Sequence, residues 1–260
     1  MISDNLRLDI RLAETPRDLR AAQRLRYEVF VQELGADGPL VDHANQLERD
    51  AFDPFYDHLI LVDPMIDPLT ERHVVGVYRL MTDARAAAAG GFYSESEYDL
   101  TRLKSSGRRL LELGRSCVSS GLRGGSAMFH LWNGLADYVL EREIEVMFGV
   151  ASFHGTDIDA LRMPLAYLHH HHLAPEALRV RAVADHFQPM DLVPVDQIDR
   201  VAAMAATPAL IKAYLRLGGF VGDGAFVDHR FNTTDVCLMM DTGRMSAKHR
   251  AYYLRKHGGE

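Results

Sequence analysis

The 260-residue sequence lacks the marks of a secreted, zinc-binding or membrane-spanning protein. Its two cysteines, Cys117 and Cys237, each lie within an apolar run, so they form neither a disulfide framework nor a zinc-ligand spacing. Residues 1–5 lack the basic start and apolar run of a signal peptide. No apolar stretch approaches the roughly 20 residues of a membrane span. These absences predict a cytoplasmic protein, although peripheral contact with the inner face of a membrane is compatible with them.

Lysine is also scarce, and arginine supplies most of the positive charge. The lysines are Lys104, Lys212, Lys248 and Lys256. Arginine suits the recognition of carboxylates and phosphates because its planar group donates two parallel hydrogen bonds. The net charge of −7 argues against general nucleic-acid binding. The content of 47% hydrophobic and 25% charged residues is ordinary for a globular protein.

Apolar periodicity predicts a mixed α/β fold. Strands are expected at residues 6–12, 58–62, 74–81, 109–118, 145–151, 178–183 and 235–240, and helices at 15–34, 126–142, 157–170, 207–217 and from 246. Successive strands imply antiparallel pairing, whereas strand–helix–strand units imply parallel pairing. We therefore expect a mixed sheet with helices on both faces. The absence of repeats and long linkers favours a single domain over residues 1–260, with a C-terminal elaboration over about 185–260.

The strand at 109–118 carries two charges inside an apolar run. Glu112 and Arg115 are costly to bury without partners, so they mark a candidate site. Being three residues apart, they would face opposite sides of a regular strand. We therefore predict a β-bulge near Gly114 that brings both charges to one side, because bulges are common beside active sites.

Further charges lie where burial is expected. Arg26 falls on the apolar stripe of the first helix, so it either pairs with a carboxylate or extends its head to water. Arg79 lies within the strand at 74–81. Asp50 and Asp53 belong to an acidic loop that also contains aromatic residues, and its spacing does not match a calcium loop. The loop is either a solvated surface or an acidic rim for a cationic ligand.

A glycine-rich turn separates the strand at 109–118 from the following helix. Gly121, Gly124 and Gly125 surround Arg123 in this turn. Backbone N–H groups at the start of a helix favour an anion, and the helix dipole adds to the attraction. The turn lacks the lysine of a Walker loop, so it is a weak phosphate-binding signal by itself.

The histidine run at 169–172 ends the helix at 157–170. Consecutive helical residues point in different directions, so the four side chains are not expected to bind one metal ion. No metal site is predicted anywhere in the chain.

Several motifs together resemble known acyltransferases. The turn at 123–127 resembles the pantetheine-phosphate turn of the GNAT superfamily of N-acyltransferases. Four ordered motifs, at 26–30, 48–53, 76–80 and 112–115, resemble those of acyl-homoserine-lactone synthases. Most of residues 6–256 resembles the ornithine N-acyltransferases that make lyso-ornithine lipid. One departure from the lactone synthases weakens a role for S-adenosylmethionine: Gly35 and Ala36 stand where those enzymes have a tryptophan.

The resemblance implies a GNAT-like fold and a reaction. A 3-hydroxyacyl group would pass from acyl carrier protein to the α-amine of L-ornithine. The only cofactor would be the phosphopantetheine that the carrier brings. Alternatives are another acceptor, such as a different amino acid or S-adenosylmethionine, and a non-catalytic acyl-binding module. A basic surface for the acidic carrier is expected, with the candidates Arg108, Arg109, Arg123 and the C-terminal basic residues Lys248, Arg250, Arg255 and Lys256. The C-terminal basic residues could instead meet anionic lipid.

The resemblance also assigns roles to residues. Catalytic residues would be Glu112 and Arg115; substrate-binding residues would be Arg26, Phe30, Asp50, Asp53 and Arg79; pantetheine-binding residues would be Gly121, Arg123, Gly124 and Gly125. Attack by an amine requires removal of a proton, by a base or a water relay. Glu112 is the candidate base, and its alternative role is that of a structural partner for an arginine.

Overall fold

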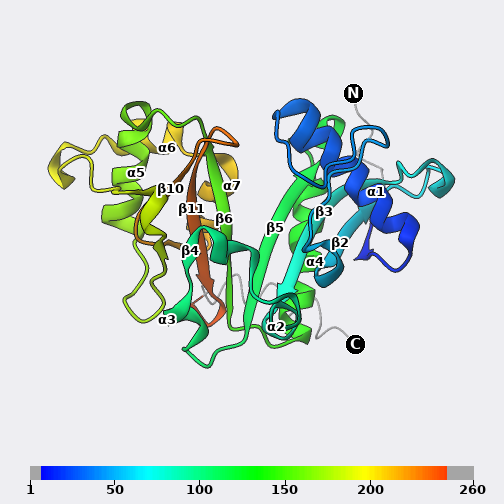
Figure 1. Ribbon diagram of the computed structural model, residues 1–260, viewed down its shortest axis with the longest axis horizontal. Helices are drawn as coiled ribbons and strands as arrows, with labels where there is room; N and C mark the ends of the chain where they lie inside the picture. The colour runs from blue at the N-terminus through cyan, green and yellow to red at the C-terminus, as the bar shows by residue number, and fades with distance from the viewer. Residues whose placement is uncertain (1–6, 245–260) are drawn as a thin grey trace. The chain divides into compact units, whose positions relative to one another are not determined.

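The computed structural model describes residues 7–244, which divide into two compact units (Figure 1). Unit 1 comprises Met1–Gly90 and Leu113–Glu143, and unit 2 comprises Gly91–Glu112 and Ile144–Glu260. Neither unit is continuous in sequence, and the chain passes from unit 2 to unit 1 within one strand. The assignment of a single domain over the whole chain stays a prediction.

Unit 1 contains the N-terminal strands of a sheet in the order β1-β2-β3-β5. The strands are β1 (Asp9–Leu12), β2 (Asp57–Val62), β3 (Val74–Thr82) and β5 (Leu110–Val118), of which residues 113–118 belong to this unit. The β1–β2 and β2–β3 pairs are antiparallel. The short helix α2 (Asp83–Ala89) follows β3.

Helix α1 (Pro16–Arg26) begins where the sequence places a capping signal. Thr15 accepts a hydrogen bond from the backbone N–H of Asp18, and the Asp18 carboxylate accepts one from the N–H of Thr15. This reciprocal pair satisfies N–H groups that the helix leaves without partners. The helix then continues as a π-helix over Tyr27–Glu33, a rare form that is frequent at functional sites. Sequence periodicity predicts the helical extent to residue 34 but not this change of winding.

Helices cover both faces of the sheet in unit 1. Alternate residues of a strand point to opposite faces. Ile60 of β2 packs in one cluster with Ala22 and Leu25 of α1. Its neighbour Leu59 lies instead beside helix α4 (Ala127–Glu141), where a Cβ at Gly134 would come within 3.2 Å of it and within 2.5 Å of Ile10. Gly134 is therefore required for the close approach of α4 to β1 and β2.

Unit 2 is built on a second set of strands in the order β5-β6-β11-β10-β8, with β9 paired to β11. They are β6 (Val146–His154), β8 (Phe187–Gln188), β9 (Phe220–Val221), β10 (Ala225–Asp228) and β11 (Thr233–Asp241), and a separate pair joins β4 (Tyr98–Asp99) to β7 (Arg181–Ala182). The helices are α3 (Thr101–Lys104), α5 (Ile158–His172), α6 (Arg200–Ala206) and α7 (Ala209–Arg216). Antiparallel β6 and β11 lie side by side in Figure 1.

The expected mixed, mostly antiparallel sheet is confirmed. The first residues of β5 pair in parallel with β6, from Leu110 opposite Val146 to Glu112 opposite Phe148, as the strand–helix–strand order predicts. Helix α6 was not predicted, since its segment follows a proline-bearing loop. The helix expected from residue 246 lies outside the described residues. No helix within residues 7–244 is long and apolar enough to cross a membrane.

The backbone of β5 has an unusual conformation next to the predicted bulge position, and the β-bulge itself stays a prediction. Arg115 has a φ of +50°, the left-handed region that L-residues seldom adopt, whereas Gly114 does not. The parallel register with β6 covers three residues and ends at Glu112. That the side chains of Glu112 and Arg115 lie on the same side of β5 stays a prediction, because the two residues belong to different units.

Candidate active site

Arg26 is the centre of a buried ion cluster in unit 1. It is the last residue of α1, and its side chain is completely buried. Its Nε donates to Glu48, and its Nη1 donates to Asp53 over 2.7 Å. The first of the two possibilities for this residue is therefore correct: Arg26 pairs with carboxylates and does not reach water.

Asp53 joins Arg26 to a second buried arginine. It begins the 3₁₀ turn Asp53–Phe55, and its Oδ1 also accepts from Nη1 of Arg79 over 2.8 Å. Its Oδ2 accepts from the side-chain amide of Gln23 over 2.9 Å and from Nη2 of Arg26 over 3.3 Å. Four hydrogen bonds thus occupy the Asp53 carboxylate, which leaves it no free lone-pair direction for a further ligand.

Arg115 and Asp50 complete the cluster at its more exposed side. Nε of Arg115 donates to Glu48 over 3.1 Å, and its Nη2 lies 3.6 Å from Asp50. Asp50 accepts from Nη1 of Arg79 over 2.8 Å. The Arg115 guanidinium also lies 5.9 Å from the ring centre of Phe30, which the π-helix presents one turn after Arg26.

The arginines of the cluster keep its buried carboxylates, Glu48 and Asp53, ionised. Burial alone would raise the pKa of Glu48, but Arg26, Arg115 and Arg79 together hold it below its usual value. Burial likewise opposes ionisation of Asp53, and Arg26 and Arg79 outweigh it, so the pKa of Asp53 lies well below its usual range. Three arginines therefore face three carboxylates, a balance that a buried ion cluster requires.

His58 adjoins the cluster as a neutral residue. Burial, followed by the charge of Arg26, lowers the pKa of His58 to about 4. Its Nε2 lies 3.2 Å from the carbonyl oxygen of Asp53 and donates to it. This contact fixes the Asp53 turn without adding to the positive charge of the cluster.

Glu112, which belongs to unit 2, has a different environment. Its carboxylate is buried and accepts from the backbone N–H of Tyr93 over 3.0 Å and of Ser94 over 2.7 Å. The Ser94 hydroxyl donates to it over 2.5 Å. These donors fix the short helix Tyr93–Ser96 to β5. Neither role weighed from the sequence anticipated this use of the carboxylate.

The glycine turn leads into α4 as predicted. Gly121 lies in the 3₁₀ turn Ser120–Leu122, and Gly124 has a φ of +79°, which favours glycine. A Cβ at Gly121 or Gly124 would meet nothing within 4 Å, and one at Gly125 would meet only ordinary contact. Arg123 is half-exposed and forms an ion pair of 2.6 Å with Glu33. Helix α4 begins after Ser126, whose side chain makes no capping hydrogen bond.

Comparison with known proteins decides the family. The chain is 62% identical over 259 residues to the L-ornithine N(alpha)-acyltransferase of Rhodobacter capsulatus, covering 100% of this chain and 99% of that protein. The chain belongs to the L-ornithine N(alpha)-acyltransferase family. The enzyme of that name from Brucella abortus is 42% identical, over 95% of this chain and 88% of its own length.

The acyltransferase family assignment agrees with the domain comparison. The family model described as an acetyltransferase (GNAT) domain matches residues 25–133. The protein is therefore an acyltransferase with a GNAT-like fold. Among solved structures, the acyl-homoserine-lactone synthase LasI is 14% identical over 91% of each chain, with a TM-score of 0.49. A likeness this distant says nothing about the site of this acyltransferase.

Most residues of the ion cluster were predicted as site residues from the sequence, but three were not. Glu48 was noted only as part of the acidic loop and of a family motif, yet it pairs with both Arg26 and Arg115. Gln23, one turn before Arg26 on α1, could have been found from its position on the buried stripe. Tyr56, whose ring lies 4.3 Å from Cζ of Arg79, gave no signal beyond its place among aromatic residues.

The histidine run takes no part in this site. The rings of His171 and His172 pack against Tyr167, and His170 lies 3.1 Å from the carbonyl oxygen of Val193. Among residues 7–244, no group of three or more His, Cys, Asp or Glu side chains could hold a metal ion. The cysteines are free and buried, and burial raises the pKa of Cys117 to about 12.

Proposed function

We propose that this acyltransferase moves a 3-hydroxyacyl group from acyl carrier protein to the α-amine of L-ornithine, giving lyso-ornithine lipid. The observation that carries the proposal is the identity of 62% over the whole chain to an enzyme named for that acceptor. In the reaction the amine nitrogen bonds to the thioester carbonyl carbon, and the carbon–sulfur bond breaks. The carrier leaves as a thiol, and the amine loses a proton, through a base or a water relay.

Different members of the ion cluster suit different tasks. Asp50 remains partly exposed at the side of the cluster, and its carboxylate suits an ammonium group of ornithine. Asp53 and Arg26 have their donors and acceptors occupied by one another and by neighbours. We therefore propose that Asp53 and Arg26 stabilise the site and do not contact the substrate. Arg79 remains a substrate-binding residue, and Arg115 with Phe30 borders the acceptor.

Glu112 fits a supporting role better than that of a proton acceptor. A carboxylate has about four lone-pair directions, and Tyr93 and Ser94 together take three of them. An incoming proton would have to compete with donors held by the backbone. Glu112 therefore holds the Tyr93–Ser96 segment in place, and proton removal falls to a water relay.

The acyl donor is assigned to the glycine turn. The turn formed by Gly121, Arg123, Gly124 and Gly125 precedes the N-terminus of α4, where a phosphate is favoured by N–H groups and by the helix dipole. The phosphopantetheine of the carrier brings such a phosphate. The enzyme then needs no cofactor of its own.

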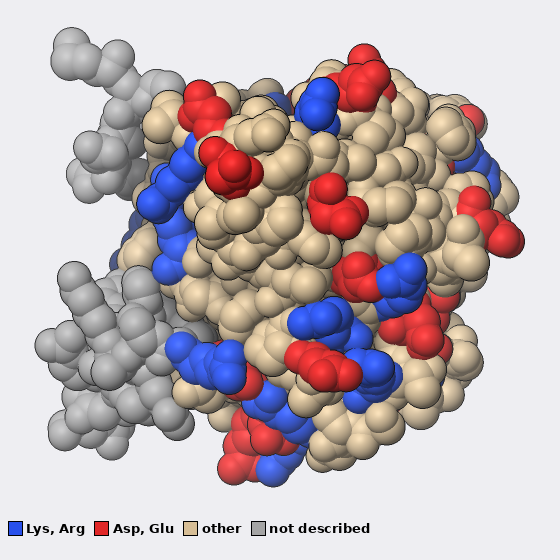
Figure 2. Space-filling model, turned by 90° about the vertical axis from the view of Figure 1, so that its left-hand side faces the viewer, with Lys and Arg blue, Asp and Glu red and all other residues tan. Residues whose placement is uncertain are grey.

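Docking of an acidic carrier requires accessible basic side chains. Arg123 is exposed for 46% of its side chain, although Glu33 partly neutralises it. Arg108 is less available, because it makes a bidentate ion pair with Asp241. On the face drawn in Figure 2, blue and red side chains of the described residues are interspersed. We therefore assign docking to Arg123 together with the C-terminal basic residues, which lie outside the described residues.

We place the reaction in the cytoplasm, with peripheral contact at an anionic membrane face where the product is delivered. The C-terminal basic residues would make that contact. Binding to vesicles with and without anionic lipid measures this contribution directly.

The proposal is tested with purified protein, a 3-hydroxyacyl carrier and a panel of amines. We expect acylation of L-ornithine, seen by mass spectrometry, and much slower acylation of lysine, glutamine and S-adenosylmethionine. Preference for another amine would reject ornithine as the acceptor. The same assay with acyl-coenzyme A in place of the carrier tests the donor, and equal rates with both would reject a dedicated carrier.

A further inference from the structure

One edge of the Arg79 guanidinium has no hydrogen-bond partner within residues 7–244, although the residue is completely buried. Nη1 donates to Asp50 and to Asp53, each over 2.8 Å. Nε and Nη2 are both buried and have no hydrogen-bond partner among the described residues. Buried polar groups are nearly always satisfied, so two unpaired donors on one charged group call for an explanation.

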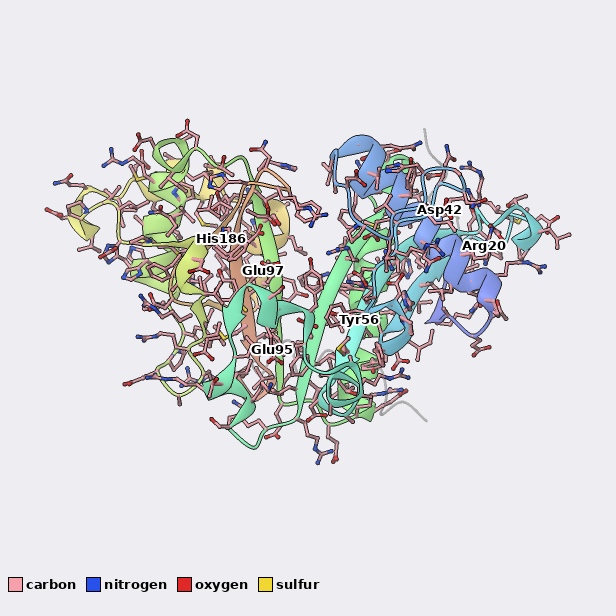
Figure 3. All side chains as sticks on the ribbon, viewed as in Figure 1. Arg20, Asp42, Tyr56, Glu95, Glu97 and His186 are labelled. Atoms are coloured by element: carbon pink, nitrogen blue, oxygen red, sulfur yellow. The ribbon has the colours of Figure 1, made fainter. Side chains whose placement is uncertain are left out.

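The two unpaired nitrogens are those that form the bidentate edge of an arginine. The N–H bonds of Nε and Nη2 run in parallel and match the two oxygens of a carboxylate. The Tyr56 ring, labelled in Figure 3, lies 4.3 Å from Cζ of Arg79 and fixes the guanidinium plane from one face. Asp50 and Asp53 hold the opposite end through Nη1. These contacts fix the orientation of the Nε–Nη2 edge without a bound ligand.

Gly114 lies opposite this edge. A Cβ at Gly114 would have Nε and Nη2 of Arg79 and the hydroxyl oxygen of Tyr56 as its three nearest atoms, each at 3.8 Å. Because Cζ is not nearer than the two nitrogens, this point lies toward the Nε–Nη2 edge and not over the centre of the guanidinium. An oxygen hydrogen-bonded to both nitrogens would sit about 2.8 Å from each. Glycine thus leaves room that a side chain would occupy.

We propose that the Nε–Nη2 edge of Arg79, left open by Gly114, binds the α-carboxylate of the amino-acid acceptor. The three arginines and three carboxylates of the cluster already balance. A diamine without a carboxylate would add only positive charge to it. An α-amino acid adds a carboxylate that can bind Arg79 and an ammonium group that can bind the partly exposed Asp50. Asp50 forms an ion pair with the same Arg79 guanidinium. The acceptor class is therefore an α-amino acid with a free carboxylate.

This inference rests on the proposed function, and Gly114→Ala tests it without disturbing the ion cluster. The added methyl group would make only ordinary contacts of 3.8 Å, and Gly114 has no positive φ, so the variant should fold. We expect the KM for L-ornithine to rise about 10- to 100-fold, the effect of losing hydrogen bonds to a charged group, with kcat within about threefold. Gly38→Ala, whose methyl group would also meet only an ordinary contact of 3.7 Å, is the matched control and should leave the KM unchanged.

Arg79→Lys supplies an independent readout, because lysine keeps the charge but lacks the parallel donors. The wild type should prefer L-ornithine to L-ornithinamide, which has a neutral amide in place of the carboxylate. The ratio of their kcat/KM values should fall about tenfold or more in both variants. An unchanged KM in Gly114→Ala, or an unchanged ratio in the variants, would overturn the inference. If the wild type acylates a different amino acid, the proposed function fails, and the same ratio is then measured with that amino acid and its amide.

Discussion

Arg115 donates to Glu48 across 67 residues of sequence, and the same Glu48 carboxylate accepts from buried Arg26. One carboxylate therefore joins the irregular strand β5 to the end of α1. Arg115 also has a positive φ, a conformation that costs of order 1–3 kcal/mol for a residue other than glycine. The ion pair with Glu48 offsets that cost by fixing the side chain where the cluster needs a third positive charge.

Replacing Glu48 should destabilise the protein strongly. Glu48→Gln leaves Arg26 buried with one fewer negative charge, and breaking a buried ion pair costs about 3–5 kcal/mol. Urea denaturation measures the free energy of unfolding. Glu28→Gln, which removes an exposed ion pair with Arg72, is the control and should cost about 0–1 kcal/mol. Equal losses in the two variants would show that burial of the cluster is not what makes it stabilising.

Stability should fall in mildly acidic solution because His58 is buried in its neutral form. Its pKa is about 4 in the folded protein and near 6.5 in an unfolded chain, so the unfolded state binds the proton first. The contribution is complete above about pH 6.5 and is lost as the pH falls toward 4. Between pH 7.5 and 5 this loss amounts to about 2 kcal/mol.

His58→Gln should remove that part of the pH dependence. Glutamine can still donate to the carbonyl oxygen of Asp53 but does not titrate. Between pH 7.5 and 5, the free energy of unfolding of the wild type should fall by about 2 kcal/mol more than that of the variant. Parallel pH profiles for the two proteins would refute the assignment of this slope to His58.

Glu112→Gln separates the two roles of that residue. An amide nitrogen would face N–H donors of Tyr93 or Ser94, which should lower the free energy of unfolding by about 1–3 kcal/mol. We expect kcat at saturating ornithine to stay within about tenfold of the wild type. A fall of about 10²- to 10⁴-fold would instead identify Glu112 as the general base. Ser94→Ala, which removes one donor and leaves the carboxylate, is the companion variant and should retain kcat.

Charge reversal at Arg123 should weaken binding of the acyl carrier protein. Arg123→Glu places a negative charge beside Glu33 and should raise the KM for the carrier substrate about fivefold or more, equivalent to about 1 kcal/mol. Steady-state kinetics at low salt gives the value, because screening weakens surface charges. Glu33→Gln frees Arg123 from its partner and should lower that KM or leave it unchanged. If Arg123→Glu has a normal KM for the carrier, docking lies elsewhere.

Much of the fold follows from local patterns. The strands at 58–62 and 74–81 are mainly apolar runs, and Thr15 with Asp18 marks the start of α1. Helix α6 has a capping Asp199 but only seven residues, many of them alanine, so no apolar stripe distinguishes it. The π-helix at Tyr27–Glu33 has no periodic signature in so short a segment.

The candidate site was less accessible than the fold to prediction from sequence. The charge of Arg26 on an apolar stripe predicts a partner, but it does not say which of several loop carboxylates supplies it. Asp50 and Glu48 are two residues apart, yet Asp50 stays partly exposed and Glu48 is buried between two arginines. Glu112 was predicted as a base from the family resemblance and its charge, with a structural partner for an arginine as the alternative role. Its donors are backbone N–H groups, which no pattern of side chains reveals.

The discontinuous course of the chain has a consequence for its synthesis on the ribosome. Residues 1–90 supply two arginines of the cluster, Arg26 and Arg79, and its three carboxylates, Glu48, Asp50 and Asp53, so this part of the cluster has one negative charge in excess. Arg115 restores neutrality, but it emerges only after the first segment of unit 2. During synthesis, the charges of this buried cluster can therefore balance only after Arg115 has left the ribosome.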